Sequence, residues 1–286
     1  MRGYGSTVKD TFVALRETDY EEPLEPARQQ FHGQGSLGNG AAMRVHPVAL
    51  ATYHQSADDV IELARNQAFV THAHPFGYNG AILQALAVHQ ALRLSTAAHD
   101  KDFKPDDLKV QDFLDTLIDI MQKVEDESPK PQLNAQRGGD RIRLSRSLGD
   151  SYTPYTDSLK QMKQVLTDRA QGSDLSADEV AAMFGNSVSA QKSVPTALFC
   201  ALRAHHPIAA FDTDDLIART LFNAISIGGD TDTIASMSCA IVGALYGEEA
   251  IDQSLYKCCE FNEDAVKLAD GLYEKINSNQ KVDANN

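Results

Sequence analysis

The apolar segment from Gly80 to Leu92 constrains the fold more than any other part of the sequence. Its apolar residues face almost every side of a helix with 3.6 residues per turn, so the pattern predicts a central helix that other elements surround. The helical repeat recurs along the chain, most clearly from Asp107 to Val124, and long alternation with a period of two is not evident. We therefore expect an all-α fold.

Short local signals mark where helices begin and end. Ser56 and Ser176 each stand three positions before an acidic residue, which is typical of a capping box. Pro195 suits the first turn of a helix, and the tetrad Asp212–Asp215 is interpreted as a helix cap. The segment from Glu125 to Arg141 is rich in Pro, Gly and charge, which predicts an exposed loop.

The composition limits size, compartment and partners. A chain of 286 residues, 42% of them hydrophobic, has room for one large domain, which we expect to span residues 1–278 before a disordered tail at 279–286. The net charge of −14 disfavours direct nucleic-acid binding. No apolar segment reaches the roughly 18 residues that a membrane helix needs. No signal peptide is evident and the four cysteines lack zinc-like spacing, which predicts reduced thiols in an intracellular protein.

The segment Gly228–Ala235 places two carboxylates and two hydroxyls in four residues, directly before an apolar helical run. Glycines permit a sharp turn there, and Asp230, Asp232 and Thr233 then form the all-oxygen cluster that a hard divalent cation prefers. The alternative is a helix start that these side chains merely cap. Three ligands from one turn cannot complete a six-coordinate shell, so the pattern predicts a metal half-site.

A glycine-rich loop carries Gly33, Gly35 and Gly38 at the spacing of a dinucleotide fingerprint, and Asp58 follows at a suitable distance. No predicted strand precedes the loop, so the context argues against a Rossmann site. Glycines still let backbone amides approach an anion, and a pyrophosphate is the obvious candidate. The alternative is a merely flexible loop.

His72 and His74 form a His-x-His pair, which can bind zinc. No third His or Cys stands nearby in the sequence. We therefore prefer His72 as a hydrogen-bonding wall of a ligand cleft.

Taken together, these motifs resemble those of a known family. Four segments follow one another in the order seen in ADP-ribosylglycohydrolases: the glycine-rich loop, Thr71–Gly80, Ser193–Ala197 and Gly228–Ala235. The combination is most similar to the branch that removes ADP-ribose from serine and degrades poly(ADP-ribose). The resemblance runs from Arg2 to about residue 275. It implies a compact domain of orthogonal helices and the activity of a hydrolase acting on a glycosidic bond.

The resemblance also implies roles for individual residues. Asp230, Asp232 and Thr233 would ligate one or both of two Mg²⁺ ions, which hold the distal ribose and position a water. The segment from Gln34 to Gly40 would cradle the diphosphate through backbone amides, with Phe31 on the adenosine side. The full set of expected substrate-binding residues is Phe31, Gln34, Gly35, Ser36, Leu37, Gly38, Asn39, Gly40, His72, Leu148 and Val188. Leu37 departs from the branch, which usually has an aromatic residue stacked on adenine.

The resemblance begins after the family's first segment, which carries a catalytic glutamate and a Thr-Asp-Asp-Thr metal motif. No catalytic residue is therefore assigned in this chain. Two alternatives to a Mg²⁺-dependent hydrolase stay open: a protein that binds ADP-ribose without hydrolysing it, and a structural relative. The implied partners are ADP-ribose-modified proteins or poly(ADP-ribose), with no membrane. We expect a monomer in the cytoplasm, the nucleus and also the mitochondrion.

Overall fold

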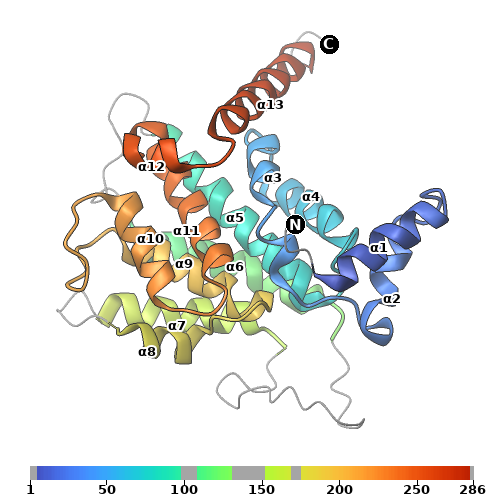
Figure 1. The fold of residues 1–286 in the computed structure, drawn as a ribbon, viewed down its shortest axis with the longest axis horizontal. Coiled ribbons are helices and arrows are strands. Elements are labelled where there is room, and N and C mark those ends of the chain that lie inside the picture. Colours follow the sequence, from blue (N-terminus) through green and yellow to red (C-terminus); the bar gives the residue numbers. More distant parts are fainter. Residues whose placement is uncertain (1–4, 98–107, 131–151, 169–174, 284–286) are drawn as a thin grey trace.

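Helix α5 (Pro75–Ala97) runs through the middle of the molecule in the computed structural model, which describes residues 5–97, 108–130, 152–168 and 175–283 (Figure 1). Its residues Ala81 to Val88 are almost completely buried, apolar for the most part, on every side of the helix. This explains the continuous apolar sequence, and the central helix predicted from Gly80 to Leu92 is confirmed. The helix begins earlier, at Pro75, because the His74 ring accepts a hydrogen bond from the Phe76 amide at 3.1 Å.

The other helices surround α5. In chain order they are α1 (Ser6–Glu17), α2 (Glu25–Gly33), the 3₁₀ turn η1 (Asn39–Ala41), α3 (His46–Ala51), α4 (Ala57–Phe69), α6 (Val110–Glu127), α7 (Pro154–Asp168), α8 (Ala177–Phe184), η5 (Ala190–Lys192), α9 (Val194–Arg203), α10 (Leu216–Ser226), α11 (Thr231–Tyr246), η6 (Glu248–Ala250), α12 (Gln253–Cys258) and α13 (Asn262–Asp283). The described residues contain no strand, only an isolated bridge between Gly38 and Ser189. The all-α prediction is confirmed.

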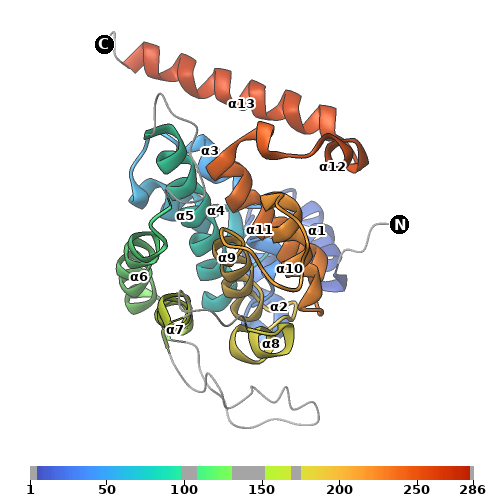
Figure 2. The same ribbon diagram turned by 90° about the vertical axis from the view of Figure 1, so that its left-hand side faces the viewer.

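One continuous core joins most of these helices. Helix α5 packs against α4 and α11, and α11 packs in turn against α9 and α10, while α6 and α7 form a neighbouring pair. Figure 2 shows α11 and α9 side by side beneath α13. Burial of this shared apolar surface is the main source of stability in such a fold. It also holds the starts of α5, α9 and α11, where the motifs described above occur, in fixed positions.

The predicted helix starts agree with the structure. Ser56 and Ser176 each form a complete capping box, with Asp59 and Glu179 respectively. Asp215 caps α10 by accepting a hydrogen bond from the Ala218 amide at 2.7 Å, so the interpretation of the Asp212–Asp215 tetrad as a cap is confirmed.

The predicted loop from Glu125 to Arg141 is wrong at its first residues. Helix α6 continues to Glu127, and Glu125 is only 1% exposed. Its carboxylate accepts hydrogen bonds from the backbone amides of Tyr155 (3.0 Å) and Thr156 (2.8 Å) and from the Thr156 hydroxyl (2.7 Å). The charged residue that suggested a loop is therefore the cap of α7. Residues 131–151 lie outside the described part of the chain.

Helix α13 extends away from the other helices at one edge of the molecule (Figure 1). It packs against α3, and His54 contacts Asn277 at 3.3 Å. The helix is described as far as Asp283, past residue 279, where the sequence predicts the start of a disordered tail. The boundary of the domain itself stays a prediction. No described helix is long and apolar enough to cross a membrane.

Candidate functional site

The glycine-rich loop is tightly packed against the start of α5. Gly35 has a left-handed φ of 74°, and a Cβ added there would lie 2.6 Å from the backbone nitrogen of His74. A Cβ at Gly77 would lie 2.5 Å from the carbonyl oxygen of Ser36. Such close approach of two backbones requires glycine on both sides. The alternative of a merely flexible loop is therefore wrong.

Several backbone amides of this loop already have partners within the protein. The Gly35 amide donates to the Gln30 carbonyl (2.9 Å), the Gly38 amide to the Ser36 hydroxyl (3.2 Å) and the Asn39 amide to the Val188 carbonyl (2.9 Å). A hydroxyl can rotate away from an amide, whereas a backbone carbonyl cannot. The Gln34 amide also donates to a carbonyl, that of Phe31, at 3.4 Å. The backbone carbonyls therefore engage the amides of Gln34, Gly35 and Asn39, and we expect an amide cradle for an anion chiefly at the centre of the loop, at Ser36, Leu37 and Gly38.

The second motif turns on two left-handed glycines, Gly228 (φ 74°) and Gly229 (φ 71°). A Cβ at Gly229 would lie 1.9 Å from the carbonyl oxygen of Asn186, which accepts the Asp230 amide at 2.8 Å. Asp230 is the N-cap residue of α11, but its side chain makes no capping hydrogen bond. The alternative in which Asp230 is simply a helix cap is therefore wrong.

A direct hydrogen bond joins the two motifs. The Asn39 side-chain nitrogen donates to Asp230 Oδ2 at 2.6 Å and to Ser193 Oγ at 3.0 Å. Asn39 is 6% exposed and Ser193 is completely buried, so these bonds lie away from bulk water. The glycine-rich loop and the aspartate turn, 191 residues apart in the sequence, thus form one site.

A short connecting segment, residues 186–193, braces the same site. At one end Asn186 accepts the Asp230 amide, as described above, and donates from its side chain to the Ile227 carbonyl at 3.0 Å. At the other end Ser189 pairs with Gly38, and the Ala190 amide donates to the Leu37 carbonyl at 3.0 Å. The connecting segment therefore contacts both motifs through backbone hydrogen bonds.

The aspartate turn fits part of a magnesium shell. Asp230, Asp232 and Thr233 offer only oxygen ligands, which Mg²⁺ prefers. Asp232 Oδ1 accepts the Thr233 amide at 2.8 Å, and the Thr233 hydroxyl lies 4.0 Å from the Met43 sulfur, a weak partner. Within the described residues, no group of three or more His, Cys, Asp or Glu side chains is arranged to hold a metal ion. The metal half-site at the aspartate turn therefore stays a prediction.

The His72 ring packs against the glycine-rich loop at Gly38 and Gly40. The ring is 4% exposed, its Nδ1 lies 2.7 Å from the Thr71 hydroxyl, and a Cβ at Gly40 would come within 3.0 Å of its Cε1. Burial, with a smaller effect of the Arg44 charge, lowers the His72 pKa to about 4, so the ring is neutral at pH 7. His74 Nδ1 is engaged by the Phe76 amide. Since both rings have structural partners, we do not retain the zinc alternative.

The remaining expected residues lie at the rim or beyond the described chain. Leu37 is 39% exposed and Val188 67% exposed, on either side of the bridge between the loop and the connecting segment. Leu148 lies outside the described residues. Phe31 is 52% exposed, with a left-handed φ of 52°.

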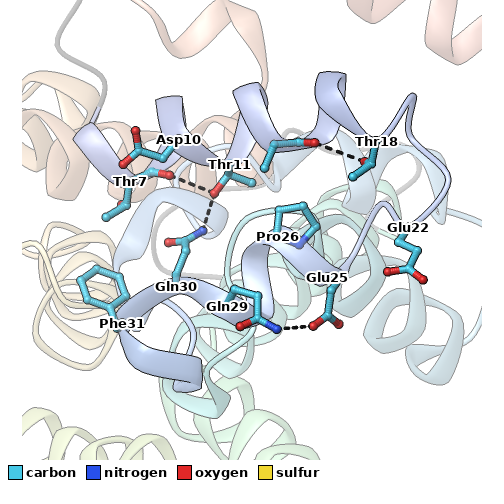
Figure 3. A pocket seen from close by; sticks show the side chains of 11 residues that line it. Thr7, Asp10, Thr11, Thr18, Glu22, Glu25, Pro26, Gln29, Gln30 and Phe31 are labelled. Atoms are coloured by element: carbon cyan, nitrogen blue, oxygen red, sulfur yellow. Dashed lines mark hydrogen bonds between the residues drawn. The ribbon is translucent and has the colours of Figure 1, made fainter.

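Phe31 also lines a separate cavity of about 450 Å³ between α1 and α2 (Figure 3). Its lining includes the acidic residues Asp10, Glu22 and Glu25, although most of the lining surface is apolar. Gln30, which also lines the cavity, donates from its side chain to the Thr11 hydroxyl at 2.7 Å. None of the aspartate-turn residues lines this cavity. We therefore place the candidate site at the two joined motifs and not at the cavity.

Sequence analysis assigned no role in the site to three residues that hold it in place. Asn186 and Ser193 connect the motifs, and Arg44 donates to the Gly40 carbonyl (3.1 Å) and the Thr71 hydroxyl (2.7 Å). Ser193 directly precedes Val194-Pro195, a helix start, so a polar role there could have been suspected from sequence. Asn186 carries no comparable signal.

Comparisons with known proteins identify the family of this chain. A family model described as ADP-ribosylglycohydrolase matches residues 1–282. The chain is 39% identical over 274 residues to the ADP-ribosylhydrolase ARH3 of Mus musculus, covering 95% of this chain and 66% of that protein. It is 39% identical over 276 residues to ARH3 of Homo sapiens, covering 95% of this chain and 67% of that protein. The chain thus spans about two thirds of the length of these relatives.

A solved structure described as an ADP-ribosylglycohydrolase-related protein complex has a similar fold. Its TM-score is 0.52 at 18% sequence identity, over 94% of this chain and 69% of that chain. At this identity the likeness supports the all-α fold alone. The family model, the identity to ARH3 proteins and the joined motifs lead to one conclusion: the chain belongs to the ADP-ribosylglycohydrolase family.

Proposed function

We propose that this chain hydrolyses the O-glycosidic bond that links ADP-ribose to protein serine or to the next unit of poly(ADP-ribose), with Mg²⁺ as cofactor. The observation that carries the proposal is the 2.6 Å hydrogen bond between Asn39 and Asp230. It places a loop suited to a diphosphate beside carboxylates suited to a cation. ADP-ribose contains both a diphosphate and a ribose whose hydroxyls can contact such a cation.

The residues of the site divide into two groups by chemistry. The amides at the centre of the glycine-rich loop, at Ser36, Leu37 and Gly38, would donate to diphosphate oxygens. Asp230, Asp232 and Thr233 would contribute to the shell of Mg²⁺, which when bound supplies positive charge for ribose hydroxyls and for a water molecule. The neutral His72 ring, which packs against the glycine-rich loop, would keep that loop in place.

The proposed reaction breaks the bond between the anomeric carbon of the ribose and the oxygen of the acceptor. Water supplies a hydroxyl to the anomeric carbon and a proton to the acceptor oxygen, so the products are ADP-ribose and free serine, or a shortened polymer. Positioning of the ribose against the water is the contribution we assign to the described residues. We assign no general acid or base to any of them.

A protein that binds ADP-ribose without hydrolysing it is the second candidate. The observation that favours it is the incomplete metal shell, since Asp230 and Asp232 are joined by no third acidic, His or Cys ligand among the described residues. Mg²⁺ demands near-octahedral oxygen geometry, so a half-shell binds it weakly. In both candidates free ADP-ribose raises the melting temperature, because a ligand that binds the folded state stabilises it.

Release of ADP-ribose from a serine-modified peptide, followed by mass spectrometry, tests the proposal. We expect release in Mg²⁺, none in EDTA, and a loss of at least about tenfold in Asp230→Ala. Asp212→Ala is the matched control, since Asp212 is an exposed aspartate three residues before the α10 cap Asp215, and it should keep wild-type activity. Binding without release would favour the second candidate. Neither binding nor release would contradict both and favour a structural role.

A further inference from the structure

The Asn39 side chain has no hydrogen-bonding freedom left on its nitrogen. An amide nitrogen carries two N–H bonds, and here one donates to Asp230 Oδ2 and the other to Ser193 Oγ. Because both acceptors lie on other parts of the fold, the amide plane is fixed by the aspartate turn on one side and by Ser193 on the other. A displacement of Asp230 therefore also displaces the side chain of Asn39, in the glycine-rich loop.

Ser193 fixes this arrangement from the connecting segment. It is completely buried, and while its oxygen accepts from Asn39, its hydroxyl donates to the Ser189 carbonyl at 3.0 Å. Ser189 in turn pairs with Gly38, the neighbour of Asn39. The Asn39 backbone amide donates to the carbonyl of Val188, the residue before Ser189, at 2.9 Å. A closed ring therefore runs from the Asn39 side chain through Ser193 and Ser189 to Val188 and back to the Asn39 backbone, and Asp230 is attached to this ring by one hydrogen bond.

From this geometry we propose that Ser193 is a positioning residue that couples cation binding at Asp230 to anion binding at the glycine-rich loop, through the Asn39 amide. The identity of the two ligands, Mg²⁺ and the diphosphate of ADP-ribose, rests on the proposed function. Ser193 itself contacts neither ligand in this account. Coupling of this kind is reciprocal: whatever one ligand does to the affinity of the other, the second does to the first.

The sign of the coupling follows from ordering. An anion on the loop holds Asn39 in place, and Asn39 then holds Asp230 Oδ2, so less motion remains to be lost when a cation binds. Binding of either ligand thus favours binding of the other. Without the Ser193 hydroxyl, the Asn39 amide can turn away from Asp230, and the two ligands then bind independently.

The test uses Mg²⁺ alone as the probe, so that chelation by a nucleotide plays no part. Backbone amide resonances of the full chain are followed by NMR during a Mg²⁺ titration. Wild type is compared with Ser193→Ala and with Ser158→Ala, a matched control. Ser158 is also a buried serine, 1% exposed, and bonds to a carbonyl of its own helix, far along the chain from the site.

In wild type and Ser158→Ala, Mg²⁺ should shift the amides from Asp230 to Thr233 and also those from Ser36 to Gly40. In Ser193→Ala the first group should still shift and the second should not. If Ser193→Ala does not fold, Asn39→Ala removes the same link and should give the same separation. Equal shifts of the loop amides in wild type and in the variant overturn the proposal.

Two further outcomes distinguish failure of the coupling from failure of the proposed function. An absence of any Mg²⁺-induced shift from Asp230 to Thr233 overturns the metal half-site and the coupling together. A titration with ADP-ribose in EDTA tests the proposed function by itself, because binding at Ser36 to Gly40 needs no metal there. Shifts with ADP-ribose but equal Mg²⁺ effects in all variants would leave the proposed function standing and reject the coupling.

Discussion

At the scale of single residues, the hydrogen bonds of Asp230 distinguish a ligand-site residue from an ordinary helix cap. An aspartate at the N-cap of a helix ordinarily accepts an amide of the first turn. In α11 the Asp230 carboxylate instead accepts the side chain of Asn39. The choice of partner turns an ordinary helix start into half of a two-part site, and sequence alone left both interpretations open.

Replacement of Leu37 by tyrosine should strengthen ADP-ribose binding. Leu37 is exposed beside the loop, where the related branch usually has an aromatic residue. A stacking partner adds about 0.5–1.5 kcal/mol beyond area effects, which corresponds to roughly a two- to twelvefold lower dissociation constant. Calorimetric titration of Leu37→Tyr and of Leu37→Met checks this, and only tyrosine should improve binding. Equal affinities would show that the base does not lie over residue 37.

Glu125 should make stability depend on pH. Burial raises the pKa of its carboxyl from 4.5 to about 7, against the hydrogen bonds from Thr156 and Tyr155. Between these two values the folded state holds a proton that the unfolded state has released. The contribution is therefore fully present below about pH 4.5 and is lost as the pH rises through 7, by about 3 kcal/mol in total.

Glu125→Gln isolates this effect. Urea unfolding between pH 5 and 8 gives the free energy of unfolding of both proteins, and the difference between them should change with pH in the direction just described. Four histidines whose pKa is lowered by desolvation to about 4 act in the opposite direction, but equally in both proteins. They are His46, His72, His74 and His205. A difference that is flat over this range would contradict a raised Glu125 pKa.

At the scale of helices and turns, patterns of apolar residues located the elements, and context set their ends. The apolar stripe from Asp107 to Val124 predicted α6, and the all-round apolar run from Gly80 predicted α5. The loop expected from Glu125 was wrong at its start because the charged residue caps α7, a partner distant in sequence. Local composition carries no information on such a partner.

Two glycines of the α11 region should respond to alanine in opposite ways. At Gly229 the left-handed φ and the Asn186 carbonyl leave no room for a Cβ, so Gly229→Ala should lower the free energy of unfolding by at least about 2 kcal/mol. Gly243 lies inside α11 with open space around it, so Gly243→Ala should raise it by roughly 0.5–1 kcal/mol. Denaturant unfolding measures both. A tolerated Gly229→Ala would mean that the turn adopts another conformation.

At the scale of the whole molecule, the site is assembled from three distant stretches of the chain. The motifs at Gly33–Gly40 and Gly228–Ala235 could be predicted, because glycine and oxygen ligands have chemical signatures at short spacing. Their contact through Asn39, and the part played by Asn186 and Ser193, could not, because these depend on how α5, α9 and α11 pack. The sequence motifs were enough to identify the family, whereas the packing of the helices was needed to show that the two motifs lie at one site.

Under the proposed function, the glycine-rich loop and the aspartate turn form one ADP-ribose site. Calorimetric titration of ADP-ribose into the wild-type chain and into Asp230→Ala, each in Mg²⁺ and in EDTA, tests it most directly. We predict one molecule bound per chain, with an affinity that Mg²⁺ raises in wild type and leaves unchanged in Asp230→Ala. No binding in either buffer, or the same Mg²⁺ dependence in both proteins, would show that the two motifs do not form such a site.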